Sequence, residues 1–293
     1  MPLTVRQSGL LDGWLGDWSI VADHSWPRQD TTVLRVRADD SDLVVKASET
    51  SHHIGREIQA HTRVLRLIDD PRFPRLLHAD ATAGLIVTGW VQGVPVESTP
   101  AEHDPALYRQ AGAALARLHR RPTPSKDYLP ATLAKIGRLL AAAGERELLD
   151  LSTLATTRRH LAGLHARPVQ VRFTHGDYQP RNWLDDNGTL RVIDFGRAAQ
   201  RPVESDLVRL LNQQLLGARE LHDAFFTGYG RPLEAFDSDV LAIENLLQSL
   251  GTIVWANTVG DHAFEDDGRA MLQRCLADPP AARPEPGARQ PSD

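Results

Sequence analysis

The 293-residue sequence contains a single cysteine, Cys275, and no apolar run of membrane-spanning length. One cysteine excludes an internal disulfide framework and a metal cluster built from several thiolates. We expect Cys275 to be a semi-buried apolar residue near the end of the last helix. Residues 1–6 lack the apolar core of a signal peptide. The sequence therefore predicts a cytoplasmic protein without a membrane partner.

Basic residues are too few to balance the acidic ones, and the formal net charge is −5. The excess lies in residues 200–278, where 13 acidic and 6 basic side chains leave a charge of −7. Nucleic-acid binding needs a basic face, so this distribution argues against nucleic acid as a partner. It would instead attract a polycationic small molecule. The alternative is that these acids only keep a helical surface soluble.

The C-terminal half of the sequence contains two short motifs, one after the other. The first runs from His175 to Asn182 (His-Gly-Asp-Tyr-Gln-Pro-Arg-Asn), and Asp194-Phe195-Gly196 follows. An Asp and an Asn five residues apart, then an Asp before Phe-Gly, are typical of a phosphoryl-transfer site. In such sites the first Asp, here Asp177, accepts the proton of the attacking hydroxyl. The Asn and the second Asp, here Asn182 and Asp194, bind Mg²⁺ against the nucleotide phosphates.

The residues around the motifs predict a strand followed by a hairpin. Residues 169–173 alternate apolar and polar side chains, as a strand would, and lead into the His175 loop. Residues 185–188 (Asp-Asp-Asn-Gly) form a turn signal between two short apolar segments. Such a hairpin brings Asn182 and Asp194 near each other, as two ligands of one cation require. Taken singly, each of these residues could instead be a turn or cap residue.

The His-Gly-Asp form of the first motif, where protein kinases have His-Arg-Asp, resembles the aminoglycoside phosphotransferase family. The resemblance is specific from Phe173 to Asp206 and looser elsewhere. It implies an α+β, protein-kinase-like two-lobed fold. A small β-rich nucleotide-binding lobe would span residues 1–93 and end in a hinge. A larger, mostly α-helical catalytic and acceptor-binding lobe would span 94–278, and the proline-rich residues 279–293 would form a disordered tail.

The N-terminal part reads as three strands, one helix and two strands, which is the order of the kinase-like lobe. The predicted strands are 18–21, 32–36, 43–46, 76–79 and 84–88, and the predicted helix is 56–68. Lys46 closes the third strand, and Glu57 follows eleven residues later. The resemblance implies that Lys46 contacts the α- and β-phosphates and that Glu57 positions it; Glu49 lies too close to the strand. The expected phosphate loop, residues 23–32, contains no glycine, so Ser25, Thr31 or Arg28 would have to substitute for a glycine-rich backbone.

Beyond residue 104 the pattern is helical. The predicted helices are 104–118, 131–143, 153–165, 212–216, 220–228 and 238–257. We expect His119 to be a packed or capping residue, and Asp206 either to cap a helix or to support the catalytic loop as in the family resembled. Residues 261–267 form a predicted acidic loop that either faces the amines of an acceptor or is only solvated.

The resemblance thus implies an ATP- and Mg²⁺-dependent O-phosphotransferase acting on a hydroxyl of a small, cationic molecule, such as an aminoglycoside or a basic peptide antibiotic. A composition rich in Ala, Arg and Leu suggests a GC-rich bacterial genome, in which resistance or self-protection would be the role. The alternatives are a kinase of choline, homoserine or sugar type and a nucleotide-binding pseudokinase. A metal-dependent phosphohydrolase using His175, Asp177 and Asp194 also stays open. We expect a monomer or homodimer.

Overall fold

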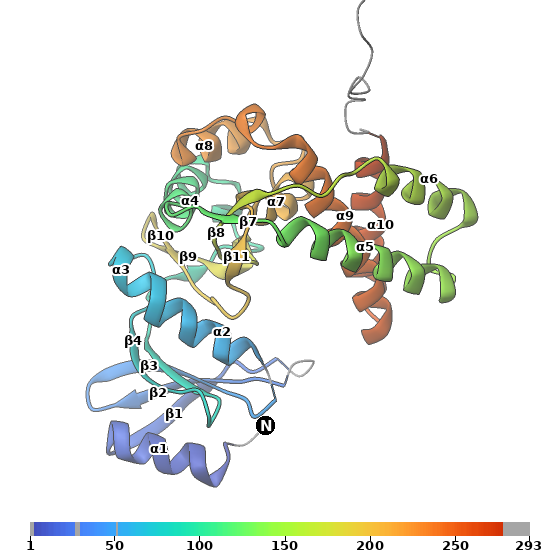
Figure 1. The fold of residues 1–293 in the computed structure, drawn as a ribbon. Coiled ribbons are helices and arrows are strands. Elements are labelled where there is room, and N and C mark those ends of the chain that lie inside the picture. Colours follow the sequence, from blue (N-terminus) through green and yellow to red (C-terminus); the bar gives the residue numbers. More distant parts are fainter. Residues whose placement is uncertain (1–2, 27–29, 51, 278–293) are drawn as a thin grey trace, which may run out of the picture. The chain divides into compact units, whose positions relative to one another are not determined.

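The N-terminal part of the chain forms an antiparallel five-stranded sheet in the order β1-β2-β3-β5-β4 (Figure 1). This computed structural model describes residues 3–26, 30–50 and 52–277. The strands are β1 (Trp18–Asp23), β2 (Thr32–Ala38), β3 (Ser41–Ala47), β4 (Leu76–Asp80) and β5 (Leu85–Gly89). Each overlaps a strand predicted from the sequence, so this part of the fold prediction is confirmed.

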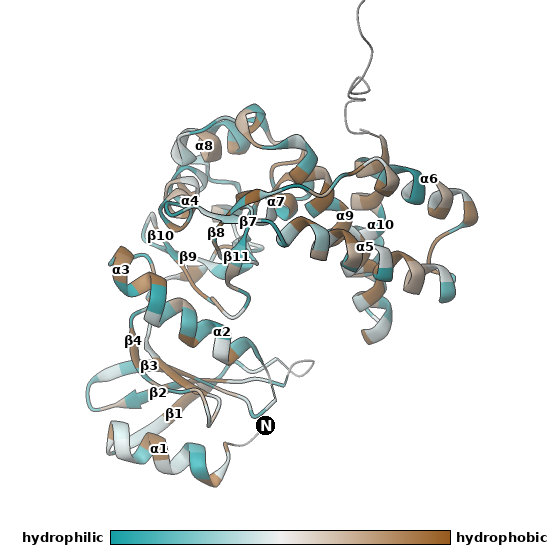
Figure 2. Ribbon diagram, in the orientation of Figure 1, coloured by the Kyte–Doolittle hydropathy of each residue, from teal (hydrophilic) through white to brown (hydrophobic). Residues whose placement is uncertain are grey.

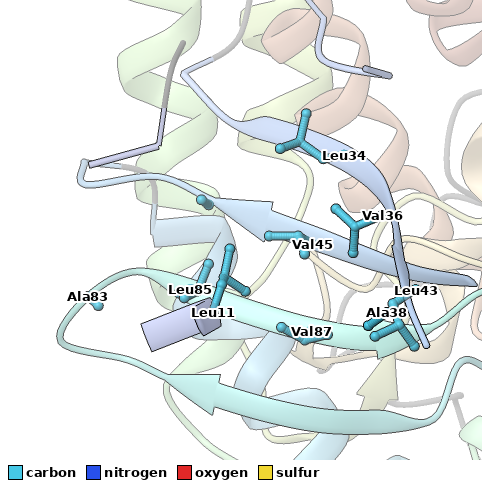
Figure 3. Packing of buried hydrophobic residues seen from close by; sticks show 10 residues of the cluster. Leu11, Leu34, Val36, Ala38, Leu43, Val45, Ala83, Leu85 and Val87 are labelled. Atoms are coloured by element: carbon cyan, nitrogen blue, oxygen red, sulfur yellow. The ribbon is translucent and has the colours of Figure 1, made fainter. Parts of the chain in front are cut away.

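One face of the sheet is covered by a helix that the sequence pattern did not reveal, α1 (Val5–Leu15). It begins with a capping box, in which Thr4 Oγ1 accepts from the Gln7 amide at 3.2 Å and Gln7 Oε1 accepts from the Thr4 amide at 3.0 Å. Leu11 is fully buried and packs against alternate strand residues (Figure 3). The cluster consists of Leu11, Leu34, Val36, Ala38, Leu43, Val45, Ala47, Ala83, Leu85 and Val87. Two glycines inside α1, which disfavour helix, explain why its pattern was missed.

The other face of the sheet carries Lys46. Lys46 pairs with Ile86 across β3 and β5, between the residues that form the α1 core. Because successive strand residues point to opposite faces, Lys46 lies on the face away from α1. The chain continues as α2 (His52–Ala60), a π-helical turn (His61–Leu65) and α3 (Arg66–Ile68), which together contain the predicted helix. In Figure 2 the central strands are coloured hydrophobic and α2 has hydrophilic stretches.

The two sequence motifs lie in loops that follow the short strands β8 (Val169–Thr174) and β10 (Thr189–Val192), within one compact unit that comprises the chain up to Thr123 and Val171–Leu233. The other elements are β6 (Val94–Pro95), α4 (Pro105–Leu118), a 3₁₀ turn (Pro180–Asn182), β9 (Trp183–Asp186), β11 (Ala199–Arg201), a second 3₁₀ turn (Val203–Asp206), α7 (Val208–Asn212) and α8 (Arg219–Tyr229). Strand β9 pairs with β10 and with β6, and β8 pairs with β11. The predicted strand and hairpin are therefore confirmed.

Helices α4 and α8 cross at two glycines. A Cβ on Gly112 would collide with the backbone at Phe225 and Tyr229, and one on Gly228 would collide with the backbone of Arg109. The helix expected at residues 212–216 was wrong. α7 ends at Asn212, where the next residue leaves helical geometry with φ −124° and ψ −92°.

The second compact unit comprises Pro124–Gln170 and the residues from Glu234. Its helices are α5 (Tyr128–Glu145), α6 (Leu151–Ala162), α9 (Ser238–Val259) and α10 (His262–Ala277). The acidic loop expected at residues 261–267 was wrong, because all but its first residue belong to α10. Glu265 is buried there and pairs with Arg269, so the charges are partly used to build the helix.

Cys275 lies near the end of α10, as expected, and is buried rather than semi-buried, with its thiol 3.9 Å from the Ala242 carbonyl. In the described part of the chain, no helix is long and apolar enough to cross a membrane. The tail predicted at residues 279–293 lies outside the described residues. The lobe boundary at residue 93 stays a prediction.

Candidate active site

Strand β8 delivers the His-Gly-Asp motif into a tight loop. The His175 side chain is fully buried, and its Nε2 donates to the Ile193 carbonyl at 3.0 Å. Its ring lies 4.7 Å from that of Phe195, which is also fully buried. One aromatic contact therefore joins the first motif to Asp194-Phe195-Gly196.

Gly176 occupies a position that no other residue fits. Its φ is +82°, in the region that favours glycine. A Cβ there would also collide with the Arg197 carbonyl and with Nη1 of Arg201. The glycine that distinguishes this motif from His-Arg-Asp is thus required by backbone geometry and by the closeness of Arg201.

Asp206 supports this loop. Its carboxylate accepts from the amides of His175 at 2.8 Å and of Gly176 at 2.6 Å. His119, at the C-terminal end of α4, lies 3.1 Å from the same carboxylate through Nε2 and 2.8 Å from the Tyr229 hydroxyl through Nδ1. Burial raises the pKa of Asp206, but the hydrogen bonds and charge of His119 outweigh it and keep that pKa below its usual value. Of the two sequence interpretations, loop support is confirmed and helix capping was wrong, and His119 is packed and capping as expected.

Asp177 follows in the loop as a buried carboxylate surrounded by arginines. Nη2 of Arg181 lies 2.6 and 2.8 Å from its two oxygens, and Nη1 of Arg209 lies 4.0 Å away. Burial raises the pKa of Asp177, but the charges of Arg181, Arg197 and Arg209 bring it below its usual value. Asp177 is therefore ionised at neutral pH, as a proton acceptor must be.

The β9–β10 hairpin brings the backbone of Asn182 next to the residue that precedes Asp194. Asn187 and Gly188 form its two-residue turn with φ of 51° and 83°, which suits a type I′ hairpin. The Ile193 amide donates to the Asn182 carbonyl at 2.9 Å, one residue before Asp194. The Asn182 side chain donates through Nδ2 to the Asp177 carbonyl at 2.8 Å. Asn182 thus links the loop of Asp177 to the strand end that carries Asp194.

Lys46 joins the sheet to this group. Its Nζ lies 2.9 Å from both carboxylate oxygens of Glu57 and 2.9 Å from Oδ1 of Asp194. Burial lowers the pKa of Lys46, but Asp194 and Glu57 outweigh it and raise that pKa. Lys46 in turn lowers the pKa of Asp194, whereas burial raises that of Glu57. Asp194 is a non-glycine residue with φ +66°, a strained conformation often found at functional sites.

The donor atoms of Asn182 and Asp194 fit a magnesium ion. Magnesium prefers oxygen ligands and usually binds through one or two carboxylates together with water and phosphate. The Asp194 side chain is 49% exposed. Within the described ranges, no group donates to the Asn182 amide oxygen. Also within those ranges, no group of three or more His, Cys, Asp or Glu side chains is arranged to hold a metal ion.

The five residues predicted for the site, Lys46, Glu57, Asp177, Asn182 and Asp194, are linked by the contacts above. What the sequence analysis missed is the arginine environment. Arg181 lies inside the first motif and could have been noticed as a cation four residues from Asp177. In the predicted phosphate loop, Ser25 Oγ accepts from the Val33 amide at 3.0 Å, so this hydroxyl serves the loop itself. Arg28 lies outside the described residues.

Comparison with known proteins places these motifs in a family. Residues 26–242 match the model of the phosphotransferase enzyme family (APH). No curated protein matches the chain in sequence.

Solved structures of aminoglycoside phosphotransferases are similar in fold. A ternary complex of APH(4)-Ia with ADP and hygromycin B is 14% identical, with a TM-score of 0.65 over 94% of this chain and 98% of that one. The GDP and kanamycin complex of APH(2")-IIIa is 17% identical, with a TM-score of 0.65 over 94% and 99%. The GDP complex of wild-type aminoglycoside 2'-phosphotransferase-IIIa is 18% identical, with a TM-score of 0.66 over 93% and 98%. The fold is therefore the α+β, kinase-like one, with an antiparallel N-terminal sheet and a helical C-terminal part.

Proposed function

The chain belongs to the phosphotransferase enzyme family, and on this premise we propose that it transfers the γ-phosphoryl group of ATP to a hydroxyl of a small molecule. The observation that carries the proposal is the position of the Lys46 ammonium, 2.9 Å from both Glu57 and Asp194. Lys46 and Asp194 are 148 residues apart in sequence. Strand β3, helix α2 and the loop after β10 therefore bring their side chains together at the Lys46 ammonium. A fixed positive charge of this kind is what the binding of an anionic nucleotide requires.

Each residue has a role that its surroundings support. Lys46 would hold the α- and β-phosphates, since a Lys ammonium neutralises phosphate charge and Glu57 fixes its flexible side chain. Asp177 would accept or orient the proton of the acceptor hydroxyl, since it is ionised and its loop is fixed by Asp206. Positioning and electrostatic stabilisation would supply most of the rate gain.

Asn182 and Asp194 would hold Mg²⁺. When bound, the ion supplies positive charge that neutralises the phosphate oxygens during transfer. The chain's own contribution is to aim the two oxygen ligands. Nδ2 of Asn182 is fixed by the Asp177 carbonyl, and Oδ1 of Asp194 is fixed by Lys46. We expect the enzyme to act in the cytoplasm, where ATP is available, as a monomer or homodimer.

Two classes of acceptor molecule are candidates. A cationic antibiotic is supported by the similar structures that contain hygromycin B, kanamycin or gentamicin, and resistance or self-protection would then be the role. A small metabolite of the choline, homoserine or sugar type is the second candidate. The charges around Asp177 bear on the choice between these two classes of acceptor.

The proposal is tested by Mg²⁺-dependent ADP release from ATP across a panel of hydroxyl compounds. We expect one class of compound to stimulate wild-type release and Asp177→Asn to lower it by about 10²–10⁴-fold, the usual contribution of a positioned acid or base. Nucleotide binding, measured by calorimetry, should change little in this variant. Asp266→Asn, an exposed acid of α10, is the matched control and should retain full activity.

Near-normal turnover by Asp177→Asn would overturn the assignment of the base. Nucleotide binding without stimulation by any compound would favour the pseudokinase. Release of phosphate from a generic phosphomonoester without ATP would instead favour the phosphohydrolase.

A further inference from the structure

Three arginines act on the Asp177 carboxylate: Arg181, Arg197 and Arg209. Arg181 contacts Asp177 directly, and Arg209 lies 4.0 Å from it. Arg209 also donates to Oε1 of Gln179 at 3.1 Å, and its side chain is 12% exposed. These two cations reach Asp177 from the motif itself and from α7.

Two further arginines reach the same loop from the segment after Asp194-Phe195-Gly196. The pairing of β11 with β8 sets Ala199 opposite Thr174, directly before the loop. Nη1 of Arg201 packs against Gly176, and Nη2 donates to the Arg197 carbonyl at 3.1 Å. The charge of Arg197 also acts on Asp177. The Arg201 guanidinium is thus held next to the residue that precedes Asp177.

The nearby carboxylates are already engaged. Asp206 binds two loop amides and His119, while Glu57 and Asp194 both bind Lys46. Within the described ranges, neither Arg197 nor Arg201 forms an ion pair with a carboxylate. Asp177, which is buried and already contacted by Arg181, also faces the positive charges of Arg197 and Arg209.

A fifth arginine, Arg56, lies on α2 and adds to the positive charge. Arg56 is exposed, and in the described part of the chain it forms no ion pair with a carboxylate either. Burial lowers the pKa of Arg56, and the positive charges of Arg201 and Arg197 lower it further, because each of them repels the Arg56 guanidinium. Such repulsion is relieved when an anion binds among them.

We propose that Arg197 and Arg201, with Arg209, bind an anionic group of the acceptor, a carboxylate or phosphate, next to the hydroxyl that Asp177 orients. This inference rests on the proposed function. Guanidinium groups suit this task because they donate paired hydrogen bonds to planar oxyanions. A polycation would be repelled from the same place. The geometry therefore favours an anionic metabolite over a cationic antibiotic as the acceptor.

The arginines could instead serve the γ-phosphoryl group, and the experiment must separate these uses. Wild type is first saturated with Mg²⁺ and AMP-PNP, so that a γ-phosphoryl analogue fills that position. Inorganic phosphate is then titrated into the complex by calorimetry. We expect phosphate to bind, and Arg201→Gln to weaken it at least tenfold while AMP-PNP affinity changes less than twofold.

The Arg201 guanidinium packs against the loop at Gly176, so a failure of Arg201→Gln to fold would have a purely structural reason. Arg197→Gln is therefore measured as a second variant of the same site. Arg219→Gln is the matched control, since this arginine of α8 has a 92% exposed side chain. It should bind phosphate as the wild type does. The proposal is overturned if phosphate does not bind the AMP-PNP complex or binds the site variants equally well. It is also overturned if both variants lose AMP-PNP affinity tenfold.

A panel of acceptors grouped as anionic, neutral and cationic completes the test. We expect ADP release to be stimulated most by anionic compounds, and Arg201→Gln to raise their KM at least tenfold with a smaller change in kcat. Strongest stimulation by cationic compounds would contradict the anionic acceptor but leave the kinase standing. If no group stimulates release, the proposed function fails, and phosphate binding still decides whether the anion site exists.

Discussion

Around Asp177, local charge rather than solvent access sets the protonation state of the proposed base. The carboxylate is buried, which on its own would favour the neutral acid, yet three arginines reverse this preference. Arg181 is the largest of these contributions and touches both oxygens. A base that must be ionised at neutral pH is thereby kept ionised inside the protein.

Replacing Arg181 should therefore shift the pH dependence of the reaction. Asp177 has to be ionised to accept a proton, so activity falls as pH drops through its pKa. Arg181→Gln removes the main cause that lowers this pKa, so the acid limb of kcat/KM should move to higher pH. Arg181→Lys keeps the charge and should shift it less. An unchanged acid limb in Arg181→Gln would show that another group controls it.

Lys46 and Glu57 form a buried pair that should serve both activity and stability. Lys46→Met should leave Glu57 buried without its partner and destabilise the fold by about 3–5 kcal/mol, together with a large loss of ADP release. The double variant Lys46→Met/Glu57→Gln removes both charges, so thermal stability should recover while activity does not. Equal melting temperatures for wild type and Lys46→Met would contradict the pairing.

Among the secondary-structure elements, those with strong local signals were predicted correctly. The hairpin of β9 and β10 follows from Asn-Gly at its turn, and the strands of the N-terminal sheet follow from alternation. Helix α1 was missed because its glycines weaken a pattern that the Thr4 and Gln7 capping box could have restored. The sequence analysis predicted a loop at the acidic start of α10, because a run of acidic residues does not by itself indicate a helix. The ion pair between Glu265 and Arg269 forms only once the helix does.

The close crossing of α4 and α8 depends on glycine, and we expect a change at this crossing to displace the loop that carries Asp177. His119 caps the C-terminal end of α4, and α8 ends at Tyr229; these two side chains meet beside Asp206. Gly228→Ala places a methyl against the Arg109 backbone, so the helices must separate. We expect a loss of about 1–3 kcal/mol in the free energy of unfolding, as overpacking causes, and a lower kcat.

The matched control is Gly137→Ala in α5, where a Cβ meets nothing within 4 Å. Because alanine favours helix more than glycine does, this variant should gain about 0.5–1 kcal/mol. Chemical denaturation measures both changes. Equal effects of the two substitutions would show that helix propensity, not the close crossing, controls the α4–α8 pair.

Over the whole molecule, the site could be predicted where its residues lie in local motifs, and not where distant strands bring residues together. Asp177, Asn182 and Asp194 stand in motifs with fixed spacing, and the resemblance added Lys46 and Glu57. Arg201 reaches Gly176 only because β11 pairs with β8, and no spacing in the sequence reports that pairing. The net charge of −5 therefore concealed a cationic environment at the proposed base.

Binding of nucleotide should link the site to the stability of the entire fold. A ligand that binds only the folded state stabilises it by about 2.7 kcal/mol at a concentration 100 times its Kd. We expect AMP-PNP with Mg²⁺ to raise the melting temperature of the wild type and EDTA to remove most of this gain. Asp194→Asn removes the carboxylate proposed to hold the ion, so its melting temperature should respond little to Mg²⁺ at a fixed AMP-PNP concentration. Asp266→Asn should respond like the wild type. Asp194→Asn and Asp266→Asn each remove one negative charge, so a difference between them reports on the position of the carboxylate. A full Mg²⁺ response in Asp194→Asn would mean that another residue binds the metal.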